Sequence, residues 1–115
     1  MIEEIAGSDT RRLERAVTVV IPAYNEGDHV AQQVRDVQTT LAATGWLFEV
    51  IVVDDGSRDA TATEADSTGA LVLRRLENRG YGAALKLGIS RAKYDWILIT
   101  DADGTYPVAA IPALL

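Results

Sequence analysis

Short apolar runs of strand length alternate with stretches of helical periodicity along most of the chain. The four strand-like runs cover residues 17–21, 48–53, 71–73 and 96–100. Between the first two runs, apolar residues recur at spacings of four, three and four, at Val30, Val34, Val37 and Leu41. That spacing is one face of an amphipathic helix. Strands that alternate with helices form βαβ units, whose strands pair in parallel. We therefore predict an α/β fold with an open, mainly parallel sheet and helices on both faces.

The length of 115 residues allows one domain, and 48% apolar with 24% charged residues is a globular balance. Residues 1–15 mix charges without a clear period, so we expect a mobile N-terminal lead-in there. Residues 16–115 would form the single folded unit, with a last helix after Pro107.

Composition excludes several classes of protein. A net charge of −6 argues against a nucleic-acid-binding protein, because phosphate backbones are bound by clustered Lys and Arg. The absence of cysteine excludes disulfides and thiolate metal sites. No apolar run reaches the roughly 20 residues that span a bilayer, and the acidic start is unlike a signal peptide. We expect a cytoplasmic protein.

Carboxylates follow three of the four predicted strands. Glu26 comes soon after the first strand, Asp54 and Asp55 after the second, and Asp101 and Asp103 after the fourth. In open parallel sheets, ligands bind beyond the carboxyl ends of the strands. The sequence therefore predicts an acidic ligand site at this edge of the sheet.

Asp101 and Asp103 are two residues apart, and in an extended segment such residues point the same way. Two close carboxylates repel unless a cation lies between them. Mg²⁺ and Mn²⁺ prefer oxygen ligands, and Mg²⁺ is commonly held by one or two carboxylates and substrate phosphates. Asp103 would bind the ion directly, whereas Asp101 would bind a ribose hydroxyl or a metal-bound water. The alternative is a solvated turn with a capping aspartate.

The other strand ends also allow two interpretations. Asp54 or Asp55 could accept the ring N–H of a nucleobase, or both could belong to a tight turn before a helix. Tyr24 could lie against a base and Glu26 could accept a hydrogen bond from the base or from a sugar, or Glu26 could simply favour a helix N-terminus.

Residues 78–82 form a glycine-rich loop before a helix predicted to extend to about Lys93. Leu85 occupies the third position of a dinucleotide-binding fingerprint, so that motif is absent. Backbone N–H groups around Gly80 could still approach a diphosphate, or the loop could be a flexible connection. We expect His29 to be a surface or partly buried residue. Three aromatic residues are expected to pack in the fold: Trp46, Tyr81 and Trp96.

Four segments in this order resemble the N-terminal half of family-2 glycosyltransferases of the GT-A fold. They read VTVVIPAYNEG, IVVDDGSRDAT, NRGYGAALKLGI and ILITDADGTYP. The chain is similar in particular to the branch of dolichol-phosphate mannosyltransferase and polyprenyl-phosphate glycosyltransferases. The resemblance covers residues 17–115, so residues 16–115 would be the nucleotide-sugar-binding half of such a domain, incomplete at its C-terminus.

The resemblance implies a nucleotide-sugar site. Its donor-binding positions would be Pro22, Ala23, Tyr24, Glu26, Asp54, Asp55, Gly80, Asp101 and Asp103. The first four would border the nucleoside, and Asp54 or Asp55 would hold the base. Asp101 and Asp103 would form the DxD element and bind Mg²⁺ or Mn²⁺ on the diphosphate.

The resemblance also implies a reaction: inverting transfer of a sugar from a UDP- or GDP-linked donor to a polyprenyl or dolichyl phosphate. Any general base would lie beyond Leu115, as would any membrane contact, and the protein would work at the cytoplasmic face of the membrane. The 115-residue chain alone would be inactive. With the predicted strands in the spatial order 3-2-1-4, residues 96–100 would be an uncovered edge.

Two other functions remain open from the sequence. One is a magnesium-binding receiver domain of signalling proteins, which is also an α/β fold with acidic strand ends. It would need an acidic pair after the first strand and a phosphorylatable aspartate after the third, which this chain lacks. The other is a non-catalytic nucleotide-binding module.

Overall fold

The computed structural model describes residues 2–4 and 15–115. Five strands form its sheet: β1 (Ile2–Glu4), β2 (Ala16–Ala23), β3 (Leu47–Asp55), β4 (Leu71–Arg75) and β5 (Trp96–Ile99). The helices are α2 (Val30–Ala42), α3 (Thr61–Asp66), α4 (Tyr81–Ser90), the 3₁₀ turn η1 (Val108–Ala110) and α5 (Ile111–Leu114). Within the described residues, no helix is long and apolar enough to cross a bilayer.

The strands are ordered β1-β5-β2-β3-β4, and the last four are parallel. The predicted α/β class and the predicted order of these four strands are therefore confirmed. The prediction of an uncovered edge at residues 96–100 is wrong, because β1 pairs antiparallel with β5 and places Ile2 opposite Leu98. A strand from the opposite end of the chain thus takes up the free N–H and C=O groups of β5. Of the predicted mobile lead-in, residues 2–4 lie in β1 and residues 1 and 5–14 lie outside the described part.

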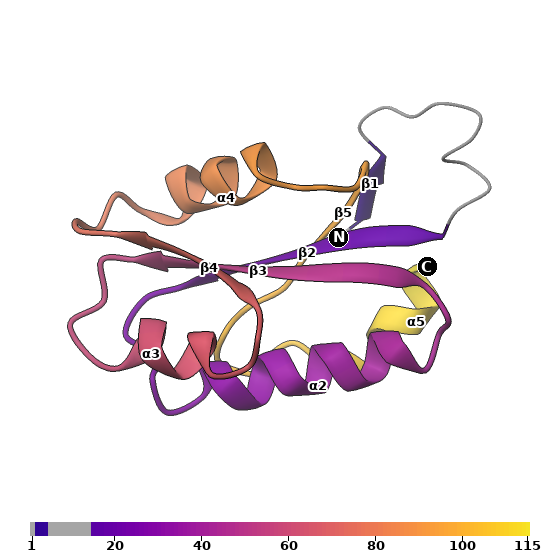
Figure 1. Ribbon diagram of the computed structural model, residues 1–115, viewed down its shortest axis with the longest axis horizontal. Coiled ribbons are helices and arrows are strands. Elements are labelled where there is room, and N and C mark those ends of the chain that lie inside the picture. Colours follow the sequence, from indigo (N-terminus) through magenta and orange to yellow (C-terminus); the bar gives the residue numbers. More distant parts are fainter. Residues whose placement is uncertain (1, 5–14) are drawn as a thin grey trace.

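Helices cover both faces of the sheet, with α4 alone on one side and α2, α3 and α5 on the other (Figure 1). Because side chains alternate along a strand, Val19 and Val52 pack in the core beneath α2, whereas Val20 and Val53 pack in the core beneath α4. Gly88 allows α4 to lie close to the sheet, since a Cβ there would be 2.5 Å from Val20 Cγ1.

The ends of several elements differ from the sequence expectation. The strand β3 continues through Asp54 and Asp55, which pair with Arg74 and Arg75 of β4, so these aspartates are strand residues and the turn begins at Gly56. The first long helix begins at Val30, the first residue of the predicted apolar face. Helix α4 ends at Ser90, short of Lys93.

Candidate functional site

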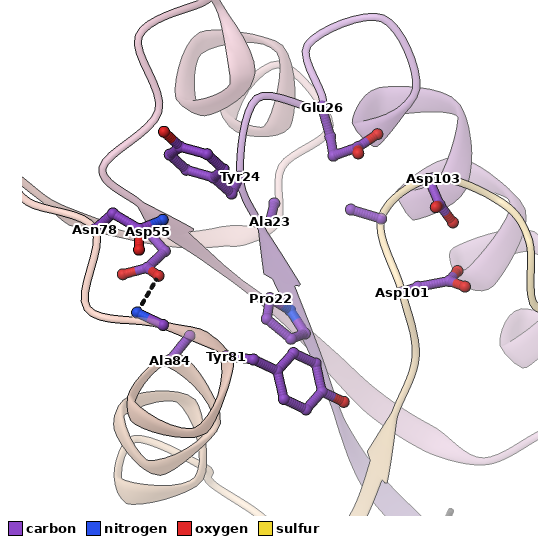
Figure 2. Close-up of a pocket in the computed structure, with 12 residues that line it drawn as sticks. Pro22, Ala23, Tyr24, Glu26, Asp55, Asn78, Tyr81, Ala84, Asp101 and Asp103 are labelled. Carbon is purple, nitrogen blue, oxygen red and sulfur yellow. Dashed lines mark hydrogen bonds between the residues drawn. The ribbon is translucent and has the colours of Figure 1, made fainter.

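A pocket of about 300 Å³ lies beyond the carboxyl ends of β2, β3 and β5 (Figure 2). Its lining comes from four separate segments: Pro22, Ala23, Tyr24, Glu26, Asp55, Asn78, Gly80, Tyr81, Ala84, Asp101, Ala102 and Asp103. Eight of the nine predicted donor-binding residues are among them, and the ninth, Asp54, is not. The sheet brings these residues together because its four parallel strands all end at the same edge.

The two aspartates at the end of β3 face opposite sides of the sheet. Asp55 lies on the α4 side and accepts backbone N–H groups from Arg79 at 3.0 Å and Gly80 at 2.8 Å (Figure 2 draws the bond from Gly80). Asp54 accepts the backbone N–H of Ser57 at 3.1 Å and is away from the pocket. Of the two carboxylates that the sequence left open, Asp55 is therefore the one that lines the pocket.

The glycine-rich loop rests directly on the turn after β3. Gly56 has a φ of 78°, and a Cβ there would lie 2.6 Å from the backbone nitrogen of Asn78. Gly80 has a φ of 97° and immediately precedes α4, whose first residue is Tyr81. The loop is thus held by the close approach of its backbone to Gly56 and by its hydrogen bonds to Asp55.

The loop after β2 carries Tyr24 and is anchored to the segment that leads into α3. Asn25 has a φ of 52°, which is uncommon outside glycine. Its side-chain oxygen accepts the N–H of Arg58 at 2.9 Å, and its own N–H donates to the Ser57 hydroxyl at 2.8 Å. These two bonds fix the backbone beside Tyr24.

The next two residues of that loop are held in the same way. Glu26 donates its backbone N–H to the Thr61 hydroxyl at 2.9 Å, and Gly27 donates to Asp59 at 3.0 Å. Asp59 also accepts the hydroxyl and the backbone N–H of Thr61. The bond from the Thr61 hydroxyl is the main reason that the pKa of Asp59 lies below its usual value.

The loop after β5 that carries Asp101 and Asp103, here called the DxD loop, forms the side of the pocket opposite Asp55 (Figure 2). Asp101 accepts the Thr105 hydroxyl and the backbone N–H of Tyr106, the latter at 3.1 Å. Asp103 accepts the backbone N–H of Thr105 at 3.0 Å, and this bond is the first cause of its lowered pKa. Asp103 is exposed, so its carboxylate is anionic at neutral pH and open to a ligand.

The donor set of this loop fits a hard cation that takes most of its ligands from substrate and water. Asp101 and Asp103 supply carboxylate oxygens only. In the described part of the chain, no group of three or more His, Cys, Asp or Glu residues could hold a metal by itself. Two carboxylates are what Mg²⁺ or Mn²⁺ uses when phosphates complete its coordination.

One of the three aromatic residues predicted to pack in the fold does not. Tyr81 was expected to pack in the fold, but it is 64% exposed and lines the pocket, because α4 begins at the edge of the sheet. Trp46 and Trp96 pack against the core as predicted, and His29 is a surface residue 3.4 Å from Glu26. The position of Tyr81 after a glycine at a strand-to-helix turn was the signal that could have identified it.

Comparison with known proteins shows the family. The model of Glycosyl transferase family 2 matches residues 18–115, and the chain belongs to this family. An undecaprenyl-phosphate 4-deoxy-4-formamido-L-arabinose transferase of Klebsiella pneumoniae (strain 342) is 39% identical over 107 residues, which cover 88% of this chain and 33% of that protein. The same-named protein of Pseudomonas aeruginosa (strain LESB58) is 36% identical over 105 residues. The chain thus spans about a third of the length of these curated relatives.

Solved structures agree with this assignment. Glucosyl-3-phosphoglycerate synthase of Mycobacterium tuberculosis matches with a TM-score of 0.74 and 27% identity over 90% of this chain and 40% of that chain. Mannosyl-3-phosphoglycerate synthase of Rubrobacter xylanophilus matches with a TM-score of 0.72 and 29% identity, over 82% of this chain and 32% of that one. One structure of the mycobacterial enzyme contains Mn²⁺, UDP-glucose and phosphoglyceric acid. The predicted GT-A fold and the resemblance to polyprenyl-phosphate glycosyltransferases are confirmed, and a receiver domain is not supported.

Proposed function

We propose that this chain binds the nucleotide-sugar donor of a glycosyltransferase that transfers the sugar to a polyprenyl phosphate. The observation that carries the proposal is the shared pocket. Eight residues predicted to bind the donor line it, and they come from the ends of three strands and from the loop before α4. Its two acidic sides suit two parts of a nucleoside diphosphate sugar. Asp55 would accept an N–H group of the base, and the DxD loop would hold a cation on the diphosphate.

Each residue would act through its position in the pocket. Tyr24 and Glu26 would border the nucleoside beside Asp55, and Asp101 would orient the ribose. Asp103 would hold Mg²⁺ or Mn²⁺, which when bound stabilises the charge on the departing nucleoside diphosphate. In the reaction, a bond forms from an acceptor oxygen to the anomeric carbon as the bond to the diphosphate breaks, so the anomeric centre inverts.

The acceptor is proposed from the relatives. Those 36–39% identical are named as undecaprenyl-phosphate sugar transferases, whereas the synthases named for phosphoglycerate products are 27–29% identical. A lipid phosphate is already an anionic nucleophile, so it depends less on a general base than a sugar hydroxyl does. We place such a protein at the cytoplasmic face of the membrane and expect the 115-residue chain alone to bind donor without turnover.

Calorimetry with UDP and with GDP, each with and without Mn²⁺, tests the proposal. We expect one of the two to bind, and to bind more tightly with Mn²⁺, while the matching monophosphate binds more weakly because it lacks the second phosphate. Absence of binding by both diphosphates would contradict the proposal. So would a stable aspartyl-phosphate on Asp54, Asp55 or Asp101 after incubation with a small phosphodonor, which would favour the receiver alternative.

A further inference from the structure

Arg75, the last residue of β4, carries a largely buried guanidinium group. Its side chain is 15% exposed, and its Nε lies 3.6 Å from Asp55 Oδ1. Both Nε and Nη2 are buried and make no hydrogen bond to any residue that the structure describes. A buried cation with unused donors is costly to the fold unless an anion lies close, so its presence requires an explanation.

The anion beside Arg75 is the carboxylate that shapes one side of the pocket. Asp55 and Arg75 are partners in the register of β3 and β4, and the Asp55 side chain is 6% exposed. The two oxygens of Asp55 accept the N–H groups of Arg79 and Gly80. A change in the orientation of this carboxylate would therefore move the backbone at the start of α4.

We propose that Arg75 is a positioning residue that acts through Asp55. Its charge holds the carboxylate in the orientation that fixes Arg79 and Gly80, and so sets the shape of the nucleoside side of the pocket. The ligand concerned rests on the proposed function, whereas the effect on the loop does not.

The same two strands contain a matched control. Arg74 and Asp54 are the preceding partners in the register, with Arg74 Nε 3.8 Å from Asp54 Oδ2. This pair faces the other side of the sheet, Arg74 is 63% exposed, and Asp54 does not line the pocket. Removal of Arg74 deletes a charge of the same kind without touching the carboxylate of the pocket.

The first experiment compares Arg75→Met with Arg74→Met. We expect Arg75→Met to weaken the binding of UDP or GDP with Mn²⁺ about tenfold, a typical effect of losing a group that orients a ligand-binding side chain. The amide proton resonances of Arg79 and Gly80 should shift upfield as their bonds to Asp55 weaken. Arg74→Met should change the affinity less than twofold and leave both amides in place, and Arg75→Lys should restore part of the loss. Equal losses in the two Met variants, or unchanged amides in Arg75→Met, would overturn the proposal.

A double-mutant cycle tests whether Arg75 acts through Asp55. If it does, adding Arg75→Met to Asp55→Asn should lower the affinity no further, and additive losses would contradict the proposal. If Arg75→Met does not fold, Arg75→Lys takes its place in the amide measurement, where shifts of Arg79 and Gly80 are again expected and their absence refutes the role. A parent protein that binds neither diphosphate would overturn the proposed function, while the amide shifts would still decide the role of Arg75.

Discussion

At one side of the pocket, Asp55 is buried and accepts backbone N–H groups from a loop more than 20 residues further along the chain. At the other side, Asp103 is exposed and accepts a backbone N–H group from its own loop. Around Asp55, the loop after β2 is tied to the segment before α3 by side chains such as Asn25 and Asp59. Among the residues that the structure describes, the DxD loop has one bond of this long-range kind, a long one of 3.5 Å from Gln33 to Asp101.

In the proposed donor site, this difference would separate two tasks. A nucleoside is recognised by fixed hydrogen-bonding groups, so its side of the pocket gains from bonds that hold several segments in place. A cation must exchange water for carboxylate and phosphate oxygens, so its side needs an accessible carboxylate. We therefore expect substitutions on the Asp55 side to change stability as well as ligand binding, and substitutions on the DxD side to change ligand binding with little effect on stability.

The largest effect is expected for Gly56→Ala. The substitution places a methyl group 2.6 Å from the backbone of the glycine-rich loop and strains a positive φ, so it should lower the free energy of unfolding by about 3 kcal/mol or more. Gly69→Ala is the matched control, because Gly69 has a φ of 81° but no atom within 4 Å of the added Cβ, and it should lose about 1–2 kcal/mol. Urea unfolding measures both, and equal losses would show that the loop does not rest on Gly56.

Asp103→Ala should have the opposite signature. It should weaken the binding of UDP or GDP with Mn²⁺ about 100-fold, or about 2.8 kcal/mol, while the free energy of unfolding changes by no more than about 0.5 kcal/mol. Asp28→Ala is the matched control. Asp28 is an exposed carboxylate that lines a neighbouring hollow together with Asp103 but does not line the donor pocket, so its removal should leave the affinity unchanged. If Asp103→Ala lowered the stability without lowering the affinity, the proposed contrast between the DxD side and the Asp55 side would be wrong.

Asn25 tests the side-chain bonds that hold the loop after β2. Asn25→Ala should destabilise the fold by about 2 kcal/mol, because alanine tolerates the φ of 52° poorly and cannot accept the N–H of Arg58. Asn25→Gly keeps the backbone conformation accessible and removes only the bond, so it should cost about half as much. Thermal unfolding compares the two, and a larger cost for glycine would refute the conformational part of this account.

The smallest effects concern the two lowered pKa values, followed by NMR titration of the carboxyl carbons. Thr61→Val should raise the pKa of Asp59, because the Thr61 hydroxyl is the first cause of its lowering. Thr105→Val should raise the pKa of Asp103 less, because there the backbone N–H is the first cause and survives the substitution. Both pKa values lie below those of the unfolded chain, so the stability they contribute is present above the unfolded value and is lost as the pH falls through the folded value. A larger shift at Asp103 would reverse this ranking.

Much of the candidate site could be predicted because its positions follow from local patterns. The apolar runs and the helical spacing of Val30 and Leu41 predict parallel strands, and parallel strands end at one edge. The aspartates after those runs were therefore expected to meet, and Asp55, Asp101 and Asp103 do line one pocket.

The amino-acid sequence by itself determined the alternation of strands and helices, the order in which acidic residues follow the strands, and hence the edge at which they gather. Tertiary structure alone decided that Asp55 and not Asp54 lines the pocket, because strand geometry places the two on opposite faces but does not say which face α4 covers. It also decided that residues 2–4 pair with β5, since three residues carry no period and their partner lies more than 90 residues away. Long-range packing selects among arrangements that are equally compatible with the local sequence patterns.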